Sequence, residues 1–439
     1  MNNADETEKK PLLLKILDKA LSSEFLQYVI LIILAYFIAI TFTGCTPSEN
    51  PKPIDLTALD NMNIPSDFNW ATSEEFDFEL EIKIPAGQSL ENYEGLPIDI
   101  LSNEGTFIMR RIIKDGKANF HIKTPTTLDF IKINCPLTDD EMSIAKPTDK
   151  WKIVFLVSDI ASYSYKTGVN DDDSDGVQND WDAFPQDATK AFVTREPYAG
   201  ATYHAFEDTW PNKGDDDFND LVTSSVCHIT TDARGKAAEM RYDLTIENIG
   251  SDKQTALMLQ LLQNSDLSTG RIIFSPLVGD ITIIESSHSN IKIESEIANT
   301  ISIIEDLSQF SKDEKTTVSF RVDLKNVEEE IHQGIHLDLF ICEDGKRGHE
   351  IHTVDGIPTS AADLSLFGTG TDVSTFTNKY WYRNSKNIPW AIEIWGTNES
   401  NSTFQPTKEG VSILSSYPNL KKWAESGGAE NTDWFLSQQ

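Results

Sequence analysis

The sequence has few basic residues, because 37 lysines and arginines stand against 70 aspartates and glutamates and leave a formal net charge of -33. Nucleic-acid binding needs a basic stripe or patch, so this balance excludes nucleic acid as a partner. The acids are also concentrated: residues 170–220 hold 14 of them and only three lysines or arginines. Like charges packed this closely favour a bound cation, and the alternative is a solvated acidic face.

Cysteine is scarce as well, with four in 439 residues: Cys45, Cys135, Cys227 and Cys342. No two of them have the C-x-x-C spacing of a zinc or redox site. Cys45 lies at the end of an N-terminal signal described below, which leaves three for the folded part. We expect these three to be buried free thiols, with a Cys227–Cys342 disulfide as the alternative.

The sequence lacks the motifs of common enzyme classes. It has no G-x-S-x-G elbow and no phosphate loop of the Walker type. The run His349-Glu-Ile-His352 is one residue too short for the HExxH zinc motif. We expect these histidines, and the pair His332 and His336, at the surface. The sequence therefore predicts no catalytic residues and a protein that is not an enzyme.

Long apolar runs are confined to the N-terminus, where Phe25–Phe42 reads FLQYVILIILAYFIAITF and Thr43-Gly44-Cys45 follows. Together they resemble a bacterial lipoprotein signal, in which residues 1–44 are removed and Cys45 carries the lipid. The alternative is an uncleaved transmembrane helix, since 18 residues just span a bilayer. We expect a lipid-anchored protein of the outer membrane in the bacterial cell envelope, with surface exposure left open.

The rest of the chain predicts a mainly β protein. Four prolines among polar residues mark 45–66 as a tether. Alternating apolar residues and frequent turn signals then predict an antiparallel β-sandwich over 67–165. Similar patterns predict a second, larger, jelly-roll-like sandwich over 191–439. The two would be joined by a calcium-binding acidic loop segment at 168–190.

The loop from residue 171 to residue 182 carries the clearest chemical signal. Oxygen-bearing side chains fall at its positions 1, 3, 5, 9 and 12, the backbone carbonyl of Val177 falls at position 7, and Gly176 stands at the turn. This spacing wraps a 12-residue loop around calcium. The predicted ligands are Asp171, Asp173, Asp175, Val177, Asn179 and Asp182. Pro185 disfavours the long second helix of a calcium sensor, so we expect a structural site.

A second acidic stretch follows at 206–222. Its predicted metal ligands are Glu207, Asp208, Asp215, Asp217, Asn219 and Asp220. Hard oxygen donors on two loops favour calcium over zinc. The alternatives are a polar hairpin and a pair of catalytic carboxylates, but glycosidase acids flank a sugar in a cleft and are not crowded into one segment.

These motifs resemble two known families. The run D-x-D-x-D-G-V-x-x-x-x-D-x-x-P from Asp171 to Pro185 is similar to a thrombospondin type 3 repeat, with Phe184 in place of the usual cysteine. The pieces at 173–177, 182–192, 205–211 and 214–222, with L-F-G-T-G at 366–370 and N-I-P-W-A-I-E-I at 387–394, resemble the LruC-domain family of bacterial outer-membrane lipoproteins. The second resemblance covers about 170–439 and implies a surface lipoprotein without an assigned reaction.

The sequence leads to the hypothesis of a calcium-stabilised lipoprotein that acts as a binding or adhesion module for an unknown protein or glycan. The alternative is a glycan-binding or glycan-processing envelope protein. Six aromatic residues near the C-terminus could offer rings for stacking on a sugar: Trp381, Tyr382, Trp390, Trp395, Trp423 and Trp434.

Overall fold

The computed structural model describes residues 58–146, 151–162, 170–264, 274–297, 299–312, 314–327, 335–354, 356–376, 380–396 and 403–436. The predicted signal peptide, the lipidation residue Cys45 and the first part of the tether lie outside these ranges. Within them, no helix is long and apolar enough to cross a bilayer.

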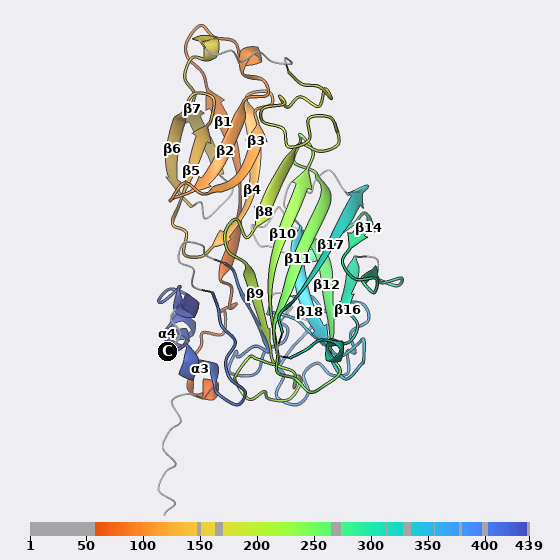
Figure 1. Ribbon diagram of the computed structural model, residues 1–439. Helices are drawn as coiled ribbons and strands as arrows, with labels where there is room; N and C mark the ends of the chain where they lie inside the picture. The colour runs from red at the N-terminus through yellow and green to blue at the C-terminus, as the bar shows by residue number, and fades with distance from the viewer. Residues whose placement is uncertain are drawn as a thin grey trace, which may run out of the picture. The chain divides into compact units, whose positions relative to one another are not determined.

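Two sheets form an N-terminal sandwich, drawn in orange and yellow in Figure 1. One sheet has the order β4-β1-β7 and the other β3-β2-β5-β6. The bounds are β1 Ser73–Lys83, β2 Pro97–Ser102, β3 Phe107–Ile112, β4 Lys117–Pro125, β5 Phe130–Cys135, β6 Asp140–Ala145 and β7 Trp151–Leu156. Both sheets bury their inner faces in one core, to which Leu80, Ile98 and Ile131 contribute fully buried side chains.

Alternation in β1 is as the sequence predicts, because Phe76, Phe78, Leu80 and Ile82 are all buried. One pairing differs from the predicted antiparallel arrangement. Strands β1 and β7 run parallel, from the pair Phe78 and Trp151 to the pair Lys83 and Leu156. A parallel pair needs a long connection, and here that connection contains β4 and all four strands of the second sheet.

Residues 192–394 form a C-terminal sandwich with sheet orders β14-β17-β11-β10-β9-β20 and β15-β16-β12-β18-β19 (Figure 1). Strand β8 also pairs with β10, and β13 with β12. The bounds are β8 Phe192–Glu196, β9 Thr202–Phe206, β10 Leu221–Thr231, β11 Ala237–Ile249, β12 Ala256–Asn264, β13 Phe274–Pro276, β14 Asp280–Ser286, β15 Lys292–Ile293, β16 Thr300–Ile304, β17 Thr316–Lys325, β18 His336–Cys342, β19 Glu350–Ile351 and β20 Ala391–Ile394. One face of β11 is buried in the core of this sandwich: Met240, Tyr242, Leu244 and Ile246.

A separate aromatic cluster, which we call the Trp423 cluster, joins the start and the end of the described chain. Rings of Phe68 and Trp70 lie edge-on to Trp423, with centroids 4.9 and 5.8 Å away. Leu59 and Met62 are buried in the same cluster. The segment predicted as a tether therefore belongs to the packed structure from residue 58 onward.

Helices are few and short. They are η1 Leu59–Asn61, η2 Leu90–Tyr93, η3 Ile160–Ser162, η4 Leu307–Gln309, α3 Ile413–Ser416, α4 Asn419–Glu425 and η5 Trp434–Leu436. Helix α4 lies near the end of the described chain. It presents Leu420, Trp423 and Ala424 to the Trp423 cluster.

The three cysteines of the described chain are free and buried, as the composition predicted. The aromatic platform that the sequence left open as an alternative near the C-terminus is not at the surface. All six rings are at most 8% exposed because they pack in cores: Trp381, Tyr382, Trp390, Trp395, Trp423 and Trp434.

Candidate metal sites

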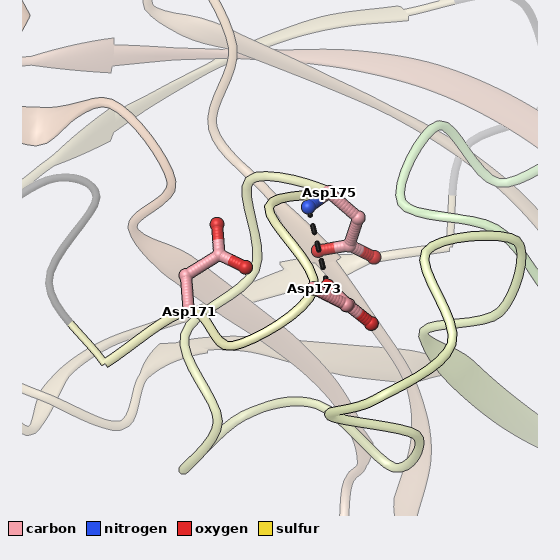
Figure 2. A group of neighbouring side chains, drawn as sticks. All are labelled: Asp171, Asp173 and Asp175. Carbon is pink, nitrogen blue, oxygen red and sulfur yellow. Dashed lines mark hydrogen bonds between the residues drawn. The ribbon is translucent and has the colours of Figure 1, made fainter.

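The Asp171–Asp182 loop gathers three carboxylates around one point. One oxygen from each of Asp171, Asp173 and Asp175 lies within 4.8 Å of the other two, and Figure 2 shows the three side chains on one turn of the loop. Backbone amides of the same loop hold them there, since Ser174 and Gly176 donate to the two oxygens of Asp171 at 2.7 and 3.0 Å. Gly176 has a φ of +97°, the left-handed turn that its position requires.

Three carboxylate oxygens of the loop are buried and have no hydrogen-bond partner: Oδ2 of Asp173, of Asp175 and of Asp182. Asp182 is only 9% exposed. Burial first, and the neighbouring carboxylates second, raise the pKa of Asp175 to about 6, and the pKa of Asp182 is raised for the same reasons. Buried anionic oxygens without donors are costly. A hard cation at this point would supply the missing contacts and would offset the repulsion between the carboxylates.

The other two predicted ligands of this loop have different surroundings. Asn179 uses its side-chain oxygen inside the loop, where it accepts a hydrogen bond from the backbone amide of Asp172 at 3.0 Å. The side chain of Val177 is fully buried against Ala191 and Phe192. The Val177 side chain thus anchors the loop to the core, while the acidic side chains form a separate group.

The anchor reaches both sandwiches. Ile112 of β3 and Trp181 of the loop pack against the small core that contains Val177. The guanidinium of Arg110, also in β3, lies 4.9 Å from the Trp181 ring centroid and is held by two hydrogen bonds to Asp99. Order in the loop is therefore coupled to contacts with the N-terminal sandwich.

A second group consists of Glu207, Asp215 and Asp217, whose oxygens also lie within 4.8 Å of one another. Glu207 is 2% exposed and accepts hydrogen bonds from the amides of Phe218 at 2.7 Å and Asp215 at 3.1 Å. A Cβ on Gly214 would fall 1.9 Å from the Glu207 carboxylate. The loop therefore wraps closely around this carboxylate, and only glycine fits at position 214.

Asp217 is similarly supplied with donors. Its Oδ2 accepts from the amide of Gly410 at 2.7 Å and from the side-chain amide of Asn219 at 3.0 Å. Burial is the main cause that raises the pKa of Asp217 to about 6 and the pKa of Glu207 well above its usual range. No buried carboxylate oxygen of this group is without a partner among the described residues. The need for a cation is therefore weaker here than in the Asp171–Asp182 loop.

Of the remaining predicted ligands, Asn219 contacts this group through Asp217, whereas Asp208 and Asp220 have other partners. Asp208 points to Lys253, whose Nζ is 3.1 Å from Oδ1, and Asp220 accepts from the Asp208 amide at 2.7 Å. Lys253 also contacts Glu343 at 3.1 Å. Sequence reasoning missed Lys253 and Glu343, because neither lies in an acidic motif and only the sheet arrangement brings them to Asp208.

Histidine placement also differs from the sequence prediction. His352 is completely buried, with Nδ1 2.8 Å from Asp338 and Nε2 3.1 Å from Glu350. Arg347 pairs with Glu350 and, at 2.7 Å, with Glu294. The surface prediction for His352 is therefore wrong: two carboxylates on β19 and β18 satisfy its ring inside the sandwich, and the group is a structural ion network.

This network predicts a loss of stability at alkaline pH. Burial alone would lower the pKa of His352, but Asp338 and Glu350 outweigh it and raise the pKa to about 9. A histidine with a raised folded-state pKa contributes stability that is complete below about pH 6.5 and lost as the pH rises through about 9. The melting temperature of the wild-type protein should therefore fall between pH 6 and pH 10. That of His352→Gln should fall less steeply. The exposed His288→Gln is the control, and equal slopes in all three would contradict the assignment.

Comparison with known protein families gives a match over slightly less than half of the chain. Residues 220–435 match the model of a domain of unknown function, DUF4842. The match starts at the end of the second acidic stretch, so the Asp171–Asp182 loop lies outside it. No match to this sequence is found among curated proteins.

Comparison with solved structures finds distant similarity. A candidate lipoprotein from Bacteroides ovatus is 14% identical, with a TM-score of 0.40 over 79% of this chain and 98% of its own. The major pilin subunit of Bacillus cereus is 7% identical, with a TM-score of 0.16 over 62% of this chain and 65% of its own. At these TM-scores no structural or functional feature is transferred from either protein.

Proposed function

We propose that the protein is a calcium-stabilised lipoprotein of the bacterial cell envelope that acts as a non-enzymatic binding or adhesion module. The observation that carries the calcium assignment is the set of buried, unpartnered oxygens on Asp173, Asp175 and Asp182. Calcium takes six to eight oxygens around one centre, and the three carboxylates gathered at alternate loop positions would supply part of this set.

The calcium proposal is confined to the Asp171–Asp182 loop. Glu207 and Asp217 already accept hydrogen bonds from backbone and side-chain amides, and Asp208 already has a lysine partner. In the Asp171–Asp182 loop a cation would instead complete a set of contacts that the protein leaves open. A bound ion would stiffen a connector that contacts both sandwiches, which suits a structural role better than a sensor.

The lipoprotein assignment rests on the Gly44-Cys45 pair after the apolar run. Cells fed an alkyne fatty acid should label the wild-type protein and not Cys45→Ser, while the buried-thiol variant Cys135→Ser should keep the label. Cells with the wild-type protein should also adhere better to a panel of extracellular-matrix proteins than cells with Cys45→Ser. Labelling of Cys45→Ser would contradict lipidation at Cys45, and equal adherence would contradict the adhesion role.

The alternative of glycan binding by aromatic stacking loses its basis. A stacking platform needs an exposed ring face, and the six candidate rings are buried. Trp390, for example, donates its indole N–H to the carbonyl of Asn212 and is 3% exposed. We therefore retain the binding-module proposal without a sugar platform at these residues.

A further inference from the structure

Three charged side chains meet at one end of the C-terminal sandwich, and the proposed function does not use them. Lys253 lies just before β12, and Glu343 directly follows β18, which pairs with β12 through Ala256 and Cys342. Asp208 lies two residues after β9, in the opposite sheet. The group therefore lies where the two sheets of the sandwich come together.

The amine of Lys253 touches both acids at once. Its Nζ is 3.1 Å from Oδ1 of Asp208 and 3.1 Å from Oε2 of Glu343. It also contacts the backbone carbonyl of Asp208, and Ser251 donates its hydroxyl to the other carboxylate oxygen, Oδ2. These contacts hold the nitrogen of one side chain against the carboxyl group of another, which is the arrangement that a condensation needs.

Glu343 is the third member. It is completely buried, and its Oε1 has no hydrogen-bond partner. Burial first, and the charge of Asp208 second, raise the pKa of Glu343 to about 9 although Lys253 is in contact. Burial alone would lower the pKa of Lys253, but Glu343 and Asp208 outweigh it and raise the pKa. The ammonium must therefore give up a proton before it can react. A buried, protonated carboxyl group next to an amine can relay protons.

We propose that Lys253 Nζ and Asp208 Cγ form an intramolecular isopeptide bond, with Glu343 as the acid–base group. The ammonium of Lys253 gives one proton to the carboxylate of Asp208, and the neutral amine attacks Cγ to form the N–C bond. The Cγ–O bond then breaks. Glu343 relays a second proton from the nitrogen to the departing hydroxyl, so one water leaves, Glu343 ends as it began, and no oxidant or cofactor is needed.

Such a bond would cross-link the two sheets. It would join residues 45 positions apart in the sequence and close a loop that contains β10 and β11. A covalent link of this kind restricts the unfolded chain, as a disulfide does. It would suit an envelope protein whose three described cysteines are unpaired.

The test is the mass of the purified full-length protein under denaturing conditions. We expect a mass lower by one water than that of the processed sequence. Trypsin should leave the peptide 196–213 joined to 242–271, because modified Lys253 is not cleaved. Glu343→Gln and Lys253→Arg should show the full mass and separate peptides. Lys190→Arg is the control, since Lys190 forms an ordinary ion pair with Glu239 at 2.9 Å, and it should keep the cross-link.

Wild-type mass decides the proposal even if a variant does not fold. A full wild-type mass, with the free peptide 242–253 ending at Lys253, would show an ordinary ion pair and overturn the proposal. A missing water that maps to another peptide would overturn it as well. Neither result bears on the calcium loop, because the two groups share no residue.

Discussion

Calcium is expected to raise the melting temperature of the protein by about 5 °C, and EDTA to reverse the gain. Free calcium at about 100 times its dissociation constant stabilises the folded state by about 2.7 kcal/mol. For a domain of about 150–250 residues, each kcal/mol raises the melting temperature by about 2 °C or more. The physical source is the loop, where Asp173, Asp175 and Asp182 each bury an unpartnered oxygen. Differential scanning fluorimetry with and without calcium measures the shift. Magnesium should give less, because it demands octahedral geometry and keeps its waters.

Two variants make the calcium result specific to the loop. The double variant Asp173→Asn with Asp175→Asn should lose the response to calcium. Without calcium it should be at least as stable as wild type, because it removes two mutually repelling carboxylates. Asp172→Asn is the control: it deletes one negative charge from an exposed residue of the same loop that is outside the three-carboxylate group, and it should keep the response to calcium. If neither calcium nor EDTA changes the melting temperature of the wild-type protein, the calcium assignment is wrong.

The second large effect is expected at the Trp423 cluster. Trp423→Ala should lower the free energy of unfolding by about 3–5 kcal/mol, the usual cost of removing a large aromatic side chain from a core. Trp423 is 1% exposed and is flanked by Phe68 and Trp70 from the other end of the described chain. Urea unfolding, followed by tryptophan fluorescence and by circular dichroism, measures the loss.

Its control is an apolar residue that the fold leaves in solvent. Leu364 is 59% exposed, and Leu364→Ala should change the free energy of unfolding by no more than about 0.5 kcal/mol. If Trp423→Ala costs as little as Leu364→Ala, the cluster contributes no packing energy and its role in joining the two segments is wrong.

Local features were predictable from the sequence. Alternation in β1 and β11 gives the buried faces directly, because side chains on a strand alternate between its two sides. The turn at Gly176 follows from spacing within twelve residues. The three carboxylates that the loop gathers, at residues 171, 173 and 175, also depend on local spacing alone.

Features that depend on distant pairs were not predictable. Parallel pairing of β1 with β7 joins two strands that are more than 60 residues apart in the sequence, so it depends on the arrangement of the whole sandwich. Glu343 meets Lys253 only because β12 and β18 are neighbours. His352 can be buried because Asp338 and Glu350 pair with both of its ring nitrogens. No local sequence pattern predicts these partners.

The Trp423 cluster also affects the order in which the chain can fold. Asn63 donates its backbone N–H to Glu425, 362 residues later in the sequence, and Phe68 and Trp70 pack on Trp423. During synthesis from the N-terminus, these early aromatic residues lack the Trp423 ring until α4 has been made. Contacts of such long range close late. Until then the rings of Phe68 and Trp70 lack this packing, so the unfinished chain carries an apolar segment that is prone to aggregation.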